Sequence, residues 1–137
     1  MRSELIDLVC VDPKRVHEFW PVAGPMLKTA VLRTNLAAWQ DIEYDILYGD
    51  ALLWLVWSGK IEAVVSTGLY ETDAGKVCVI TALAGENMSR WLQLISKIET
   101  YAKDEGCKCV RIYGRKGWAR VLDGYLEKNV ILDKELN

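Results

Sequence analysis

The sequence predicts a single α/β domain built on a mixed sheet, and three observations lead to this expectation. Residues 51–57 and 61–70 are apolar runs joined by Ser-Gly-Lys, which is the pattern of a β-hairpin. Residues 89–105 change to a period of 3.6, which indicates an amphipathic helix that ends at a glycine. A short apolar run at residues 108–113 follows, so this part of the chain predicts a right-handed β-α-β unit with parallel strands.

The chain before the hairpin predicts one strand and two helices. Residues 4–11 alternate loosely and end at Asp12, which can begin a helix together with the proline after it. Pro21 and Pro25 fall inside that helix and are expected to bend or break it, because proline lacks the backbone N–H and its ring clashes with the preceding turn. Residues 35–47 carry apolar side chains at helical spacing and predict a second helix.

The remaining segments complete the expected order of elements. Residues 76–84 predict a further strand after the hairpin, residues 116–122 a short helix, and residues 129–136 a final strand. The expected order is therefore β-α-α-β-β-β-α-β-α-β. No linker or internal repeat divides the chain, so residues 1–137 are expected to form one domain.

Composition and charge narrow the class of protein. Hydrophobic residues make up 51% of the 137 residues and charged residues 26%, which is enough apolar side chain for one core. The formal net charge of −2 gives no general electrostatic reason to expect nucleic-acid binding. No apolar run approaches the roughly 18 residues of a transmembrane helix. Residues 1–7 lack the apolar region of a signal peptide, so we expect a cytoplasmic protein.

The four cysteines are expected to be free thiols, with no metal site. Cys107 and Cys109 are two residues apart, so both face the same side of a strand. A zinc site needs about four nitrogen or sulfur ligands. The sequence has one histidine, His17, and no second cysteine pair at ligand spacing. Buried thiols in a reducing compartment explain the pattern better than a metal centre does.

Three stretches resemble the GNAT family of acyltransferases, and the resemblance covers nearly the whole chain. ALLWLVWSGKIEAVVSTGLYE is similar to the family's central hairpin. KIETYAKDEGCKCVRIYG is similar to the end of the cofactor helix with its glycine stop and the next strand. ARVLDGYLEKNVILDKEL is similar to the closing helix and strand. The resemblance implies a GNAT-like fold and the transfer of an acetyl group from acetyl-CoA to an amine.

The resemblance also implies an acetyl-CoA site between two parted parallel strands, where backbone amides at a helix N-terminus receive the diphosphate. The residues it assigns to cofactor binding are Leu83, Ala84, Gly85, Asn87, Ser89, Arg90 and Arg115. The family motif at this loop is R/Q-x-x-G-x-G/A, and its defined positions fall on Glu86, Ser89 and Trp91, none of which fits. Glu86 brings negative charge toward the phosphates, and Trp91 adds bulk.

An ordinary helix start is the alternative interpretation of this loop. Asn87 or Ser89 would then cap the helix, since both side chains can accept hydrogen bonds from the first free amides. In the same interpretation Arg90 is solvated and Trp91 belongs to the apolar stripe of the helix.

Proton transfer is assigned by the resemblance to Tyr125, as the general acid that protonates the departing CoA thiolate. The alternative is that its ring packs on the core and its hydroxyl faces solvent. Glu71 is the candidate general base, with Glu62 as a second candidate. Glu43 and Asp45 on the second helix could contact a substrate amine, although exposed carboxylates on helices are usually only solvated.

The stretch GRKGWARVLDGY is basic and aromatic. It and the strand before it contain Arg111, Arg115, Lys116 and Arg120. The cluster favours an anion-facing turn, and four cations in a chain of net charge −2 argue against a nucleic-acid surface. Short phage and prophage proteins with a GRKGWARVL segment are also similar to this chain.

The alternative function is therefore a catalytically inactive GNAT-fold module, encoded by a phage or prophage, that binds a protein partner. Its location would be the host cytoplasm or the virion. The six tryptophans favour a partner or a homo-oligomer, because a partly exposed tryptophan often marks a contact site.

Overall fold

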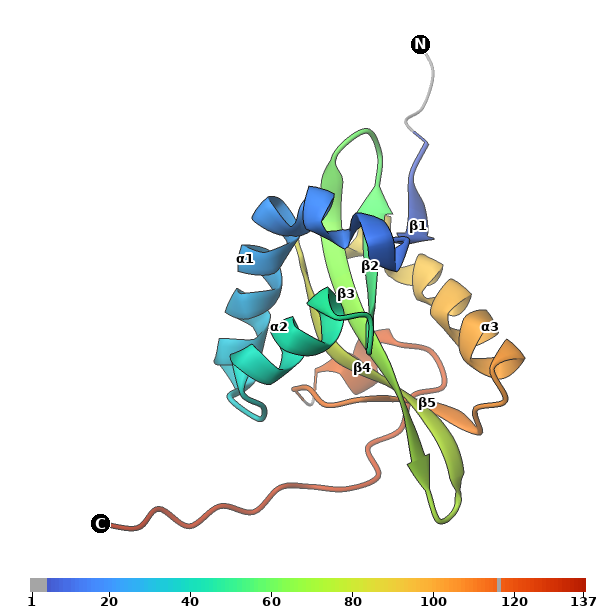
Figure 1. Ribbon diagram of the computed structural model, residues 1–137. Helices are drawn as coiled ribbons and strands as arrows, with labels where there is room; N and C mark the ends of the chain where they lie inside the picture. The colour runs from blue at the N-terminus through green and yellow to red at the C-terminus, as the bar shows by residue number, and fades with distance from the viewer. Residues whose placement is uncertain (1–4, 116) are drawn as a thin grey trace.

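A five-stranded mixed sheet forms the centre of the molecule (Figure 1). The computed structural model describes residues 5–115 and 117–137. The strands are β1 (Asp7–Cys10), β2 (Leu52–Trp57), β3 (Ile61–Thr72), β4 (Gly75–Gly85) and β5 (Cys109–Ile112), and they lie in this order across the sheet. Neighbouring strands from β1 to β4 are antiparallel, and β4 and β5 are parallel. The sequence-predicted hairpin and β-α-β unit are both present.

Helices cover both faces of the sheet (Figure 1). The helices are α1 (Val16–Thr34), α2 (Trp39–Leu47), α3 (Ser96–Asp104) and α4 (Trp118–Val121). Buried side chains of α1 and α2 pack with Leu53, Leu55 and Val64 on one face. The other face packs against α3 and the segment around α4. The apolar stripes read from the sequence thus become two separate cores, one on each side of the sheet.

Helix α1 is continuous, so of the two expected effects of its prolines, a bend or a break, the break does not occur. Pro21 and Pro25 both lie inside the helix and both are exposed. The opposite side of α1 is buried, with Ala23 and Leu27 fully covered by the sheet. The carbonyl groups that lose a partner at the prolines belong to His17 and Pro21, which are exposed, so their hydration by solvent is compatible with a helix held by packing of its buried side.

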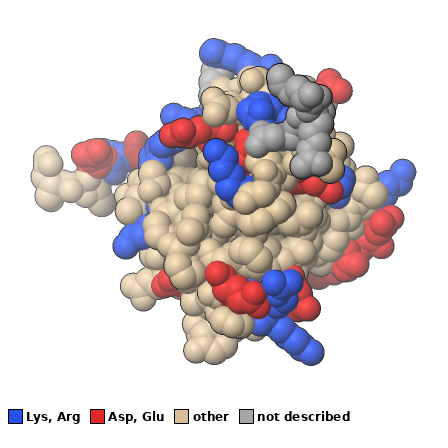
Figure 2. Space-filling model, turned by 90° about the horizontal axis from the view of Figure 1, so that it is seen from above, with Lys and Arg blue, Asp and Glu red and all other residues tan. Residues whose placement is uncertain are grey.

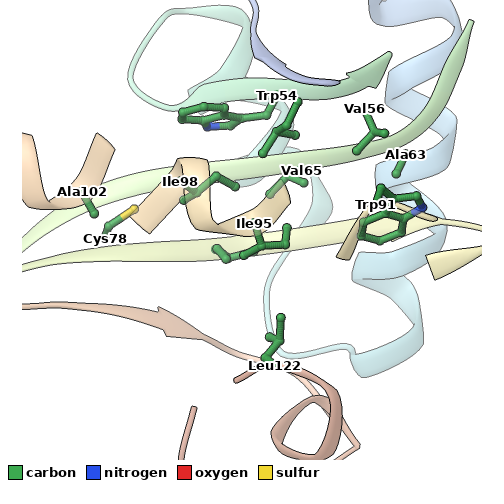
Figure 3. Packing of buried hydrophobic residues seen from close by; sticks show 12 residues of the cluster. Trp54, Val56, Ala63, Val65, Cys78, Trp91, Ile95, Ile98, Ala102 and Leu122 are labelled. Atoms are coloured by element: carbon green, nitrogen blue, oxygen red, sulfur yellow. The ribbon is translucent and has the colours of Figure 1, made fainter. Parts of the chain in front are cut away.

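The core on the α3 face is anchored by Trp91 (Figure 3). Its indole is only 1% exposed and lies against β2 and β3, near Val56 and Ala63. The indole Nε1 donates a hydrogen bond of 2.9 Å to the carbonyl oxygen of Glu86. Trp91 therefore packs in this core, as the ordinary-helix-start interpretation expects, and its side chain also ties the loop after β4 to the sheet.

Two segments differ from the sequence-based expectation. The helix expected at residues 89–105 is regular only from Ser96, and two short 3-10 turns, Met88–Arg90 and Leu92–Ile95, precede it. Trp91 and Ile95 in this segment are both buried. The final strand expected at residues 129–136 is wrong, because residues 126–137 have no regular structure and every one of them is exposed.

Trp91→Ala is expected to lower the free energy of unfolding by about 3–5 kcal/mol, because it leaves a cavity where a whole indole was buried. Trp91→Phe retains a ring but loses the hydrogen bond to Glu86, and should cost about 1–2 kcal/mol. Urea unfolding followed by circular dichroism measures both. Equal losses for the two variants would contradict the anchoring role of the indole.

Candidate functional site

Strands β4 and β5 part halfway along β4. Their pairing runs from Val77 with Cys109 to Ile80 with Ile112 and stops there. Strand β4 continues to Gly85, whereas the chain after Ile112 turns away through Tyr113. Beyond Ile80, the edge of β4 that faces β5 therefore has no strand beside it in the described part of the chain.

A β-bulge in β4 lies at the point where the strands part. Ser66 of β3 pairs with Ala82, but the next residue, Thr67, pairs with Ile80, so Thr81 is left without a partner residue. The hydroxyl groups of Ser66 and Thr81 are in hydrogen-bond contact, and Thr81 Oγ1 also donates to the carbonyl oxygen of Ser66 at 3.2 Å. Bulges locally increase twist and redirect side chains, so this one turns β4 away from β5.

The opening between the two strands is a small cleft of about 50 Å³. One wall is β4 from Ile80 to Leu83, and the other is the chain from Ile112 to Arg115 together with Trp118. The end of α1 closes the cleft with Ala30, Arg33 and Thr34. The indole of Trp118 lies so close to Gly114 that a Cβ atom there would be 2.7 Å from Trp118 Cδ1. A side chain at position 114 would therefore displace the indole of Trp118 from this wall.

The loop after β4 is compact and internally bonded. Arg90 Nε and Nη2 donate to the two carboxylate oxygens of Glu62 at 2.9 and 3.0 Å, and this pairing lowers the pKa of Glu62. The arginine predicted to face a phosphate therefore contacts a carboxylate on β3. Asn87 has a left-handed backbone, with φ at 53°, and its side chain caps no helix. The indole of Trp91 is on the α3 face and is not among the residues that line the cleft.

Of the residues that the sequence assigned to cofactor binding, Leu83 and Arg115 line the cleft. Ala84, Gly85, Asn87, Ser89 and Arg90 follow in the continuation of β4 and its loop. Gly85 is tightly packed, because a Cβ atom there would lie 2.4 Å from the Cβ of Ala63. Lys116, which belongs to the predicted basic cluster, lies outside the described residues.

The two predicted catalytic residues lie outside the lining of the cleft, as far as the chain is described. The Tyr125 hydroxyl donates to Glu99 Oε2 on α3 at 2.9 Å, and burial together with this bond raises the pKa of Tyr125. Glu71 is exposed and lies opposite Lys76 in the pairing of β3 with β4. Lys76 is four residues before Ile80, so Glu71 lies roughly 13 Å along the strand from the start of the cleft. Their assignment to catalysis stays a prediction.

Sequence analysis assigned no role in the site to Tyr70 or Tyr113. Tyr70 packs against Gly68 of β3, and its pKa is raised by burial and by the nearby groups Asp45 and Tyr113. Tyr113 also lines the cleft and is 55% exposed. Its place directly after the parallel strand was visible in the sequence. The bulge at Thr81, by contrast, gives no signal in composition or periodicity.

Other features of the described residues bear on the kind of site. No group of three or more potential metal ligands occurs among them, and the cysteines are free. Burial raises the pKa of Cys78 to about 11. None of the helices in the described ranges is long and apolar enough to cross a membrane. On the face seen in Figure 2, basic and acidic side chains are interspersed, and no extended area of one sign forms.

Comparison with solved structures finds acetyltransferases at low sequence identity. An aminoglycoside acetyltransferase from an uncultured soil metagenomic sample, in complex with sisomicin, matches with a TM-score of 0.67 and 13% identity over 96% of each chain. A predicted acetyltransferase from Clostridium acetobutylicum, in a structure with acetyl-CoA, matches with a TM-score of 0.65 and 12% identity, again over 96% of each chain.

A third structure, a GNAT family acetyltransferase from Staphylococcus aureus, has a TM-score of 0.64 and 14% identity, covering 98% of this chain and all of the other. No family model and no curated protein matches the sequence. Structural similarity at this level of sequence identity establishes the fold alone. The chain has the fold of the GNAT acetyltransferases, as its element order, its parted parallel strands and these matches all indicate.

Proposed function

We propose that this protein is an N-acyltransferase that binds a coenzyme A thioester between β4 and β5, acetyl-CoA in the simplest case, and transfers the acyl group to an amine. The observation that carries the proposal is the parting of two parallel strands at the Thr81 bulge, which leaves a strand edge bordering a cleft. A fold hosts many functions, so the argument rests on this site. Similar structures that contain acetyl-CoA or CoA support it.

The free edge of β4 suits the pantetheine arm of coenzyme A. This arm is an extended chain with two amide groups, and a strand edge binds such chains by main-chain hydrogen bonds, as it binds an added peptide strand. The edge from Thr81 to Leu83 borders the cleft and has no neighbouring strand on that side among the described residues. In the proposed complex the arm takes the place that a longer β5 would occupy.

Positive charge for the anionic part of the ligand comes from Arg33 at the end of α1 and from Arg115 in the wall after β5, both of which line the cleft. Arginine binds phosphate through paired, charge-assisted hydrogen bonds. Backbone amides of Gly85, Asn87 and Ser89 remain the proposed contacts of the diphosphate. They act without the glycines of the family motif, and Arg90 is engaged by Glu62.

The proposed reaction is direct attack of the amine on the thioester carbonyl. A C–N bond forms, the C–S bond breaks, and the amine's proton passes to a base while the CoA thiolate takes up a proton. Tyr113 is the proposed acid, because it lines the cleft, whereas Tyr125, to which the resemblance assigns this role, is not among the lining residues. Asp45 remains the candidate contact for a cationic amine, and Glu71 remains the predicted base.

One observation favours a second candidate function, a catalytically inactive module of the same fold. The cleft of about 50 Å³ is far smaller than the roughly 300–1,000 Å³ of most small-molecule sites. Binding of a CoA thioester therefore requires β5 and the chain after it to move away from β4. A protein in which they cannot move would retain the fold and bind only a partner.

Acetyl-CoA is expected to raise the melting temperature of the protein in a concentration-dependent way. At 100 times its dissociation constant a ligand contributes about 2.7 kcal/mol to stability. A thermal shift series with acetyl-CoA, using free acetate as the control ligand, makes the measurement. No shift at millimolar acetyl-CoA would exclude the acyltransferase and leave the inactive module.

Arg115→Glu should weaken acetyl-CoA binding by roughly tenfold or more, since a charge-assisted hydrogen bond contributes about 1.5–3 kcal/mol. Arg120→Glu is the matched control, because Arg120 is exposed on the neighbouring α4 and is not among the residues lining the cleft. Isothermal titration calorimetry gives both affinities. An equal loss of affinity in the two variants would mean that the overall charge of the protein attracts acetyl-CoA, and that Arg115 makes no specific contact with it.

Tyr113→Phe should lower kcat about 100-fold and leave the affinity for acetyl-CoA nearly unchanged, because a general acid acts in the transition state. Tyr125→Phe should mainly lower stability, since it removes the hydrogen bond to Glu99. Steady-state kinetics with a panel of amines and thermal melts separate the two roles. A large loss of kcat in Tyr125→Phe, with no loss in Tyr113→Phe, would show that Tyr125 is the general acid.

A further inference from the structure

The C-terminal segment of this chain has the pattern of a strand but pairs with no strand in the part of the chain that the structure describes. Every residue from 126 to 137 is exposed, and the segment extends out from the body of the molecule (Figure 1). Val130, Leu132 and Leu136 are 66%, 88% and 87% exposed. In an extended chain these three side chains point to the same side, together with Lys134, so this face is apolar except at that one position. Apolar residues in such a pattern are expected to be covered.

A free sheet edge in the same molecule is the natural complement of this segment. Strand β5 is the last strand of the sheet, so its outer edge has unpaired backbone groups. All of its residues are only half-buried, although Val110 and Ile112 pack against the α3-side core. One more strand beside β5 would pair these backbone groups and cover the exposed margin of that core.

The chain around β5 and the C-terminal segment carry opposite net charges. The chain around β5 carries Lys108, Arg111 and Arg115 and no acidic residue between Gly106 and Gly117. Residues 129–136 carry Asp133 and Glu135 with Lys134 between them, which gives the segment a net charge of −1. Opposite charges on adjacent strands stabilise their pairing modestly and help to set its register.

We propose that residues 129–136 of one copy add as a strand to the outer edge of β5 in a second copy, and that the exchange is reciprocal, giving a two-fold dimer. The connection from Tyr125, which Glu99 holds in place, to residue 129 is short. Short connections favour exchange between copies over closure on the same chain. Reciprocal pairing also removes both free edges at once.

The first test is the mass of the protein in solution, by light scattering coupled to size-exclusion chromatography. The full chain should have twice the 15.5 kDa mass of one copy at high micromolar concentration. Ile131→Pro should give a monomer with an unchanged fold, because it removes a ladder N–H from the middle of the segment. Asn137→Pro, outside the segment, is the matched control and should remain dimeric.

A second variant, Leu132→Lys, tests the apolar face alone and should also be monomeric. Since Leu132 is 88% exposed in the isolated chain, this change cannot harm the fold of one copy. A full-length protein that is monomeric, or a dimer that persists in both Ile131→Pro and Leu132→Lys, would overturn the proposal.

Hydrogen exchange separates a second copy from closure on the same chain. In the proposed dimer the amides of residues 129–136 are protected, and their protection falls on dilution as the dimer dissociates. Protection that does not change with concentration would show that the segment folds onto its own β5. Absence of protection at all concentrations would show that it pairs with no strand, and either result refutes the exchange.

Discussion

The parallel pairing of β4 and β5 extends over only four residue pairs, and the rest of the candidate site depends on where it stops. The extra residue Thr81 changes the register between β3 and β4 just beyond the last of these pairs. A strand that is well held by β3 on one side thereby has an open edge on the other. Without this local irregularity β5 could follow β4 further, and the wall that we assign to ligand binding would be ordinary sheet interior.

The loop after β4 lacks the glycines of the GNAT family motif, yet this chain retains the GNAT fold. Glycines would let a diphosphate approach the backbone closely, but this chain has Trp91 buried in the core and Arg90 paired with Glu62. The buried Trp91 indole and the Arg90–Glu62 ion pair both hold the loop against the sheet. The loop is therefore held in place without a ligand. The cleft beside it is narrow, so a ligand can enter only if β5 and the chain after it move. The energetic cost of binding then lies in that movement.

Sequence reasoning succeeded where one periodic pattern decides the structure. The hairpin and the β-α-β unit follow from alternation, helical spacing and a glycine stop at Gly106. It failed where tertiary packing overrides a local rule, as at Pro21 and Pro25, where a fully buried helix face outweighs two missing hydrogen bonds. The position of the cleft could not be predicted, because a bulge such as Thr81 arises from competition between two neighbouring strands and has no composition of its own.

Strand β5 connects the two proposals physically. It is short, half-buried and paired on one side only, so it is the least restrained strand that borders the cleft. Its inner side determines how far the cleft can open, and its outer side is where a strand from a second copy would add. A strand on the outer edge would hold β5 in place from the side away from β4, and thereby influence the movement that a CoA thioester requires. Association between copies and ligand binding would then be thermodynamically linked, with each changing the free energy of the other by the same amount.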